Sequence, residues 1–331
     1  GEVPDFDLYD PTKLNTEQQI ELAKRVEAAA MSTDERVTNS EGGDFDSSSG
    51  RVVLGNSHGF LGEYQSSSFS MSVSPVATDP ETGAMQRDSW YDVQRKFAKL
   101  DSPEAVGLEA ARRTVRKLGA KKVATQRVPV VFDAEAAGSL MGNLCSAVSG
   151  YSLYKGASFL AGQLDKPLAP EYVTVYDDGR VVGGLGSRPF DGEGLPTRRT
   201  TVVERGVLKS YLLDTYSGRK LGLASTGNAS RSVGENPSVG PTNFYLAPGS
   251  KTAQDIIKTV KQGLYVTDLI GFGINMVTGD YSRGAAGFWV ENGEIQFAVQ
   301  EVTIAGNMRD MFKQIVAVGN DLELRSNIRT G

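Results

Sequence analysis

The sequence contains only one histidine, His58, and only one cysteine, Cys145, among 331 residues. A lone cysteine cannot form a disulfide within the chain, and secreted chains more often carry several, so we expect a reducing, cytoplasmic setting. Catalytic zinc sites usually take two or three histidines, assisted by Asp, Glu or Cys. One histidine therefore argues against a conventional zinc hydrolase centre within the chain, and we expect it to have no catalytic residue, metal or cofactor of its own.

Long apolar runs and an excess of basic residues are also missing. No stretch approaches the roughly 20 apolar residues that a membrane helix needs, and the acidic, polar residues 1–10 do not resemble a signal peptide. The net charge of −5 argues against a nucleic-acid-binding surface, which needs Lys and Arg to meet phosphates. We interpret the basic residues between positions 112 and 127 as a solvent-exposed helix face and connector. We therefore expect neither a membrane nor a nucleic-acid partner.

The residues that are present favour an α+β protein with two domains. A length of 331 residues permits two separate cores. The first domain is predicted to begin with a helix over Thr16–Met31, whose apolar residues recur at helical spacing. Ser66–Ser74 alternates apolar residues with serines, the period of a half-buried strand, whereas the turn-rich stretch Glu41–Gly50 is expected to separate two short strands. A connector around Arg127 predicts domains at 1–127 and 128–331.

Hairpins and one unusual helix characterise the second predicted domain. The helix Ala134–Ser149 consists largely of small residues, which allow close approach to other backbone, so we expect a buried central helix. Turn signals at Asp177-Asp178-Gly179, Arg205-Gly206 and Asn292-Gly293 predict three antiparallel hairpins. Mixed antiparallel sheets with packed helices, in both domains, indicate the α+β class.

Several long sequence segments resemble those of the PmbA (TldE) branch of the TldD/PmbA metalloprotease family, the "modulator of DNA gyrase" type. They are Asn56–Phe60 (NSHGF), Met85–Asp92 (MQRDSWYD), Leu185–Gly194 (LGSRPFDGEG), Gly206–Asp214 (GVLKSYLLD), Val277–Asn292 (VTGDYSRGAAGFWVEN) and Thr303–Ser326 (TIAGNMRDMFKQIVAVGNDLELRS). The resemblance extends over essentially the whole chain. It implies that the family's N-terminal domain and a final strand after Gly331 are missing from this sequence.

The resemblance also implies a degenerate zinc helix. In the TldD branch the central helix carries HExxxH, in which two histidines hold zinc and the glutamate serves as general base. In the matching register of this chain, Met141 and Ser146 replace the two histidines and Gly142 replaces the glutamate. None of the three can coordinate zinc or remove a proton. We therefore expect zinc only in an HExxxH-bearing partner subunit.

Two polar loops and the single histidine supply candidates for substrate-channel or partner contacts. The loop Arg188–Gly194 combines carboxylates with glycines, and so does the loop Thr278–Gly287, in which we expect Arg283 to pair with a carboxylate of a peptide or of Asp191. For His58, a structural histidine of the turn is preferred over a contact residue, and Cys145 is interpreted as a buried, inert thiol. The candidates are His58, Arg188, Asp191, Glu193, Asp280 and Arg283.

Three hypotheses for the function remain open. The first is a zinc-less subunit that pairs with an HExxxH-bearing TldD-like subunit in a heterodimer and presents unfolded peptide for cleavage. The second is a homodimeric peptide-binding or regulatory protein without protease activity. The third is an independent hydrolase whose metal is held by Asp191, Glu193 and Asp280.

Overall fold

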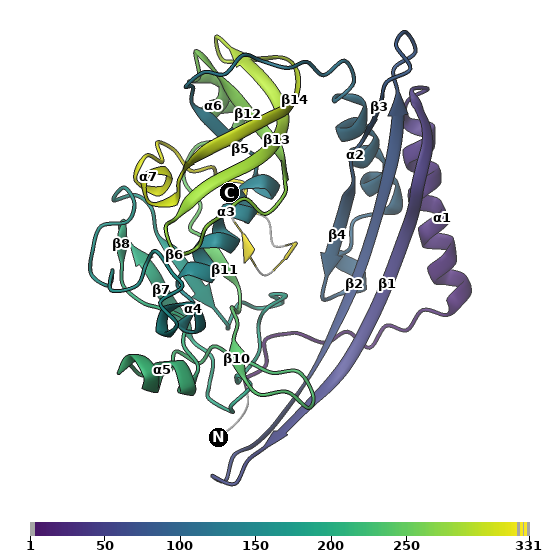
Figure 1. The fold of residues 1–331 in the computed structure, drawn as a ribbon. Coiled ribbons are helices and arrows are strands. Elements are labelled where there is room, and N and C mark those ends of the chain that lie inside the picture. Colours follow the sequence, from purple (N-terminus) through teal and green to yellow (C-terminus); the bar gives the residue numbers. More distant parts are fainter. Residues whose placement is uncertain (1–3, 323–324, 327, 330–331) are drawn as a thin grey trace.

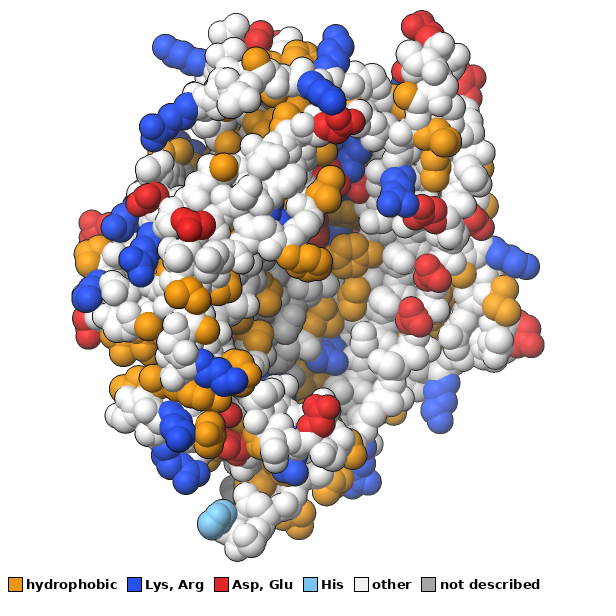
Figure 2. Space-filling model, viewed as in Figure 1, with side chains coloured by type: hydrophobic (Ala, Val, Ile, Leu, Met, Phe, Trp, Pro, Cys, Tyr) orange, Lys and Arg blue, Asp and Glu red, His pale blue; other side chains and the backbone are white. Residues whose placement is uncertain are grey.

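The computed structural model describes residues 4–322, 325, 326, 328 and 329 of the chain, which form two lobes (Figure 1). The lobes face each other across a hollow that is visible in the space-filling view (Figure 2). Helices pack on sheets that are mostly antiparallel, so the predicted α+β class is confirmed. Among the described residues, no helix combines the length and apolar character needed to cross a membrane.

The first lobe is a long, four-stranded sheet with two helices packed on it (Figure 1). Its elements are α1 (Thr16–Thr33), β1 (Val37–Gly55), β2 (Leu61–Thr78), β3 (Met85–Arg87), β4 (Trp90–Gln94), the 3₁₀ helix η1 (Phe97–Lys99) and α2 (Pro103–Val115). Helix α1 begins with a capping box, in which Asn15 accepts from the backbone of Gln18 and Gln18 bonds back to Asn15. The alternating residues Phe69, Met71 and Val73 of β2 are buried, as the period-two pattern predicts.

The prediction of two short strands around Glu41–Gly50 is wrong, because β1 continues through this stretch. Residues Gly43–Gly55 pair without a break with β2, and the two register shifts lie before them, between Val37 and Asn39 and between Ser40 and Gly43. A Cβ on Gly43 would stand 2.4 Å from the carbonyl oxygen of Ala23 in α1. The glycine therefore permits close approach of a helix rather than marking a turn.

The second lobe combines a five-stranded sheet, a four-stranded sheet and a two-stranded ribbon. The five-stranded sheet has the order β15-β11-β6-β7-β8, and the four-stranded sheet has the order β14-β13-β12-β5. The strands are β5 (Val130–Phe132), β6 (Val175–Asp178), β7 (Arg199–Glu204), β8 (Val207–Leu208), β9 (Ala229–Ser230), β10 (Ser238–Val239), β11 (Phe244–Leu246), β12 (Gln262–Ile270), β13 (Asp280–Glu291), β14 (Glu294–Asn307) and β15 (Ile328–Arg329). The helices are α3 (Ala134–Ala147), α4 (Gly150–Tyr154), α5 (Thr215–Leu221), α6 (Ala253–Lys258) and α7 (Met308–Lys313).

Two of the three predicted hairpins of this lobe are confirmed. Strands β7 and β8 pair across Arg205-Gly206, and β13 and β14 pair across Asn292-Gly293. The hairpin predicted at Asp177-Asp178-Gly179 is wrong, because β6 pairs instead with β7 and β11. Asp177 is buried, and its carboxylate accepts hydrogen bonds from Asn228 and Thr242, so this acidic residue belongs to the interior of the sheet and not to a solvated turn.

Candidate functional site

Helix α3 lies in the second lobe, on the side that faces the first lobe (Figure 1). It begins at Asp133, whose side chain accepts a hydrogen bond of 2.8 Å from the backbone N–H of Ala136. One face is buried in the second-lobe cores through Ala136, Met141 and Leu144. The central, small-residue helix expected from the sequence is therefore present.

The three positions that match the zinc helix lie in different surroundings on α3. Met141 is buried in the large hydrophobic cluster, whereas Ser146 is exposed and its Oγ donates to the carbonyl oxygen of Gly142 at 3.0 Å. A Cβ on Gly142 would meet no atom of the described residues within 4 Å. Among the described residues there is also no group of three or more His, Cys, Asp or Glu placed to hold a metal ion. The residues of this helix therefore do not fit a zinc ion.

Cys145 is buried on the same helix. Burial raises the pKa of its thiol to about 12, because the thiolate is poorly solvated in an apolar environment. At neutral pH the free group is a protonated thiol, which is a poor nucleophile.

The open space beside Gly142 leads to a test with a matched control. We expect Gly142→Ala to stabilise the protein by about 0.5–1 kcal/mol, because alanine is the better helix former. The same substitution in α2, Gly107→Ala, is expected to lower the free energy of unfolding by about 1–3 kcal/mol, because it overpacks the helix contact. There the new Cβ would stand 2.6 Å from the carbonyl oxygen of Val26 in α1. Urea unfolding measures the change in the free energy of unfolding of each variant, which is expected to be positive for Gly142→Ala and negative for Gly107→Ala. A loss of stability in Gly142→Ala would show that this face of α3 is covered.

Arg283 lies on β13 and contacts α3 rather than the acidic loop, which is the loop Arg188–Gly194. Its Nη1 donates to Oγ of Ser139, and its Nη2 donates to the carbonyl oxygen of Leu269 at 3.2 Å. The pairing expected with Asp191 does not form, because the oxygens of Asp191 accept from the backbone N–H groups of Glu193, Leu195 and Ala229. Arg283 thus joins β12 and β13 to the central helix.

The remaining carboxylate candidates also bind protein groups. Glu193 accepts from the backbone N–H and the hydroxyl of Thr215, at the start of α5. Asp280 accepts from the hydroxyl of Thr278 and the amide of Asn307, and these hydrogen bonds lower the pKa of its carboxyl. Each carboxylate therefore stabilises its own loop, and the three do not meet in a shared cation site.

The tip of the β1–β2 hairpin carries His58 and reaches the loop that contains Arg188. His58 is exposed in the turn at Asn56–Phe60. Next to it, the ring of Phe60 packs on Phe190, with the ring centroids 5.1 Å apart. The structure therefore brings the hairpin tip and the acidic loop together, and it places Asp280 and Arg283 elsewhere.

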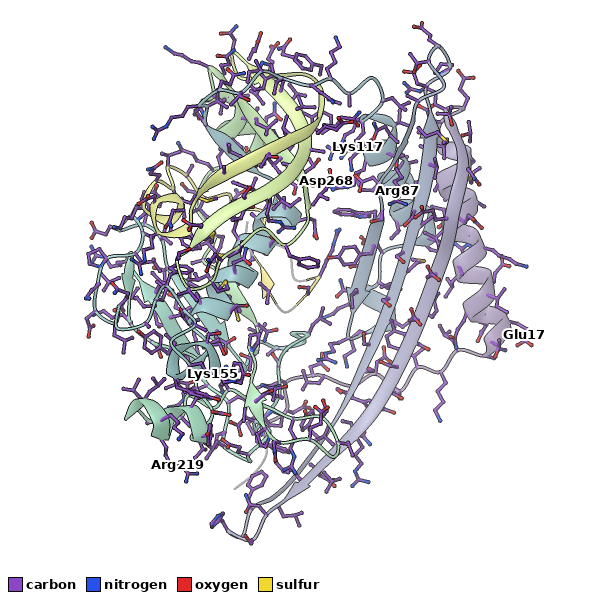
Figure 3. All side chains as sticks on the ribbon, viewed as in Figure 1. Glu17, Arg87, Lys117, Lys155, Arg219 and Asp268 are labelled. Atoms are coloured by element: carbon purple, nitrogen blue, oxygen red, sulfur yellow. The ribbon has the colours of Figure 1, made fainter. Side chains whose placement is uncertain are left out.

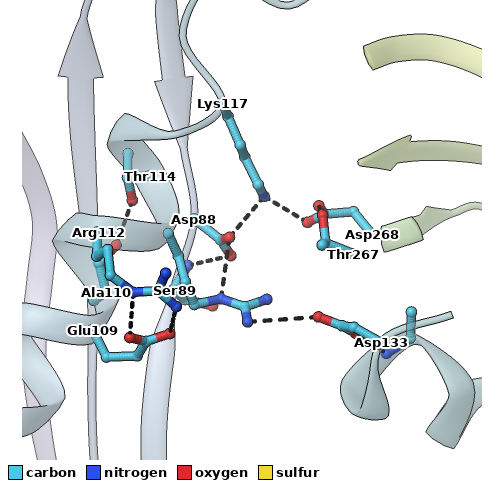
Figure 4. Close-up of polar contacts among 12 residues, drawn as sticks. Asp88, Ser89, Glu109, Ala110, Arg112, Thr114, Lys117, Asp133, Thr267 and Asp268 are labelled. Atoms are coloured by element: carbon cyan, nitrogen blue, oxygen red, sulfur yellow. Dashed lines mark hydrogen bonds and ion pairs between the residues drawn. The ribbon is translucent and has the colours of Figure 1, made fainter. Parts of the chain in front are cut away.

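A buried cluster of charges joins the two lobes (Figure 4). Two of its members, Arg113 and Lys117, were expected on a solvent-exposed helix face, and that interpretation is wrong for them because their side chains are buried between the lobes. We call it the interlobe ion cluster, and its members are Asp88, Arg113, Lys117, Asp133 and Asp268. Nζ of Lys117 lies 2.8 Å from Oδ2 of Asp88 in its own lobe and 2.7 Å from Oδ1 of Asp268 in the other, and Figure 3 shows Lys117 and Asp268 meeting between the lobes. Arg113 reaches Asp88 at 3.3 Å and Asp133 at 3.7 Å. In the sequence, the only indication of this cluster was that Arg113 and Lys117 lie four residues apart, which places them on the same face of a helix.

Asp133 links this cluster directly to the central helix, because it is also the N-cap of α3. Burial raises the pKa of its carboxyl to about 6, although the N–H of Ala136 and the positive charge of Arg113 both oppose the rise. Beside it, the phenolic oxygen of Tyr91 on β4 donates to Glu135 of α3 at 3.0 Å. The position of α3 relative to the first lobe is therefore set by charged and polar contacts.

Comparisons with known proteins give the same family across both lobes. The model of the PmbA/TldA metallopeptidase central domain matches residues 9–118, and that of the PmbA/TldA metallopeptidase C-terminal domain matches residues 125–331. The metalloprotease PmbA of Escherichia coli O157:H7 is 45% identical over 330 residues, which cover 100% of this chain and 71% of that protein.

Solved structures agree with these sequence matches. A suggested modulator of DNA gyrase from Thermotoga maritima is 30% identical, with a TM-score of 0.92 over 100% of this chain and 76% of that one. TldE from Thermococcus kodakarensis, at 24% identity and a TM-score of 0.82, covers 97% of this chain and 74% of that one and shares the fold. The chain therefore belongs to the PmbA/TldD metallopeptidase family.

Proposed function

We propose that this chain is a non-catalytic subunit of a PmbA/TldD-type metalloprotease that processes unfolded peptides and small proteins. The observation that carries the proposal is the zinc-helix position of α3, where Met141 is buried in the core and Gly142 and Ser146 offer no imidazole or carboxylate. A family scaffold that keeps the helix but lacks its ligands suits a subunit that shapes a chamber for a partner's active site.

The partner in this proposal is a TldD-like subunit that bears HExxxH and supplies the zinc, and the setting is cytoplasmic. Two features of the chain support a role with peptides. The hollow between the lobes borders the central helix (Figures 1 and 2). Strand β1 lies at one edge of its sheet, and an edge strand can pair with an extended peptide through main-chain hydrogen bonds irrespective of sequence.

The test is cleavage of an unfolded reporter peptide by this protein alone, by an HExxxH-bearing relative alone, and by the mixture. We expect cleavage by the mixture, and we expect it to be lost when the HExxxH glutamate of the relative is replaced by glutamine. Cleavage by this chain alone, after contaminating protease has been excluded, would contradict the proposal and favour an independent hydrolase. No cleavage by a mixture whose relative is shown to hold zinc would favour the homodimeric peptide-binding or regulatory protein.

A further inference from the structure

Arg188 is a half-buried guanidinium whose main chain is held in place, whereas two of its side-chain nitrogens have no hydrogen-bond partner in the part of the chain that the structure describes. Its N–H donates to the carbonyl oxygen of Gly179 at 3.2 Å, and its own carbonyl oxygen accepts from the hydroxyl of Thr197. Its Nε and Nη2 atoms are enclosed, and among the described residues neither has a hydrogen-bond partner. Enclosed guanidinium donors without acceptors are costly, so this arrangement needs an explanation.

Neighbouring acidic residues act on Arg188 through their charge but accept no hydrogen bond from its side chain among the described residues. Asp177 lies near enough for the charge of Arg188 to oppose the pKa rise that burial causes in Asp177. Its oxygens are nevertheless occupied by the amide of Asn228 and by the backbone N–H and hydroxyl of Thr242. Asp191 and Glu193, in the same loop as Arg188, are occupied by N–H and hydroxyl donors as described above. The donors of Arg188 are therefore left for a group from outside the described residues.

A second arginine makes the surroundings of Arg188 still more positive. Arg95, after β4, donates to the carbonyl oxygens of Ser67, Gly184 and Leu185, so it holds the two lobes together without meeting a carboxylate. Tyr64 of β2 lies near both guanidinium groups, which oppose the pKa rise that burial causes in its phenol. The ring of Tyr64 packs on Phe190, with the centroids 5.3 Å apart. Two cations thus share an aromatic-walled seam between the lobes.

We propose that Arg188 binds a carboxylate of the peptide substrate at this seam. A guanidinium presents parallel N–H donors that match the two oxygens of a carboxylate, and Arg188 remains partly exposed, so a ligand can reach it. The positive charge of Arg95 strengthens the attraction, while its own donors stay on backbone carbonyls. The inference rests on the proposed function for the identity of the ligand, because a peptide brings carboxylates at its C-terminus and on Asp and Glu side chains.

The experiment measures binding of three fluorescent peptides of equal length to the intact protein by polarisation. One peptide has a free C-terminal carboxylate and otherwise neutral residues, the second is its C-terminal amide, and the third is the amide with one internal glutamate. We expect at least one carboxylate peptide to bind about tenfold or more tightly than the neutral amide. If the peptide with the free C-terminus shows this gain, the bound carboxylate is the C-terminal one. If the peptide with the internal glutamate shows it, the bound carboxylate is that of a side chain.

The variant Arg188→Gln is expected to bind all three peptides equally, at the level of the neutral amide. Arg180→Gln is the matched control, because Arg180 is an exposed arginine nearby and its replacement removes the same charge. Equal loss of the carboxylate preference in both variants, or no preference in the unmodified protein, would overturn the proposal. Circular dichroism of Arg188→Gln confirms folding, and if it does not fold, the comparison of the three peptides on the unmodified protein still decides the result.

Cleavage of the same peptides by the mixture with the HExxxH-bearing relative separates this inference from the proposed function. Cleavage without any carboxylate preference in binding would overturn the role of Arg188 alone. A carboxylate preference that depends on Arg188, without cleavage in the mixture, would support the site and contradict the protease subunit.

Discussion

Replacing Lys117 by methionine is expected to lower the free energy of unfolding by about 3–5 kcal/mol, the usual cost of removing one partner from a buried ion pair. The ammonium of Lys117 lies between Asp88 of the first lobe and Asp268 of the second, and the side chain of Lys117 is only 10% exposed. Methionine keeps most of the side-chain volume but leaves both carboxylates without this cation. The buried Asp88 then has only Arg113 to compensate it.

Urea unfolding followed by tryptophan fluorescence measures this loss and shows where it occurs. The two tryptophans lie in different lobes, Trp90 on β4 and Trp289 on β13, so variants that keep only one of them report each lobe separately. We expect the lobes of the Lys117→Met variant to unfold at more widely separated urea concentrations than those of the unmodified protein.

Lys122→Met is the control for this prediction. Lys122 pairs with Glu301 on the surface, where the two side chains are 71% and 59% exposed, and exposed pairs contribute about 0–1 kcal/mol. A loss in Lys117→Met no larger than that in Lys122→Met would show that the interlobe ion cluster does not hold the lobes together.

The second large effect is a pH dependence that originates at Asp133. Its pKa is raised from 3.8 to about 6 in the folded protein, so the fold favours the protonated carboxyl. The stabilising contribution is fully present below pH 3.8, and it is lost as the pH rises through about 6. Asparagine resembles the protonated carboxyl and does not titrate, so Asp133→Asn is expected to gain stability relative to the unmodified protein by roughly 3 kcal/mol at most between pH 4 and 7.

The measurement compares the free energies of unfolding of the unmodified protein and the Asp133→Asn variant at several pH values from about 2 to 7, a range that covers the titration of both Asp133 and the control residue Asp34. Asp34→Asn supplies a control of opposite sign, because hydrogen bonds from Arg36 lower the pKa of Asp34 to about 2. The contribution of Asp34 is lost as the pH falls from 3.8 towards 2, so the Asp34→Asn variant should lose stability relative to the unmodified protein as the pH rises through that range. A difference between Asp133→Asn and the unmodified protein that does not change with pH would show that Asp133 is not the titrating group.

Features that depend on neighbours along the chain were predictable. The alternation of Phe69, Met71 and Val73 and the Asn292-Gly293 turn each encode local geometry, and both appear where expected. The long sequence segments that resemble the family were also recognisable from the sequence. The absence of zinc ligands at Met141, Gly142 and Ser146 follows from residue type alone, since no packing can turn these side chains into an imidazole or a carboxylate.

Features that depend on distant partners were not predictable from the sequence. The glycines and serines of residues 41–50 read as a turn, and they form a strand because β2 and α1 provide their pairing and their packing. Asp177 reads as a turn residue, and it is buried because Asn228 and Thr242 satisfy its carboxylate. In both cases a tertiary contact overrides a local preference.

The sequence by itself determined the family and the α+β class, because each follows from residue identity or short-range periodicity. Only the tertiary structure decided which charges are compensated. It joins Lys117 to Asp268 across 151 positions. It occupies Asp177, Asp191 and Glu193 with neutral donors, and within the described residues it leaves Nε and Nη2 of Arg188 without an acceptor. Electrostatic interactions depend on the distance between groups in space and on their burial, and the linear sequence specifies neither.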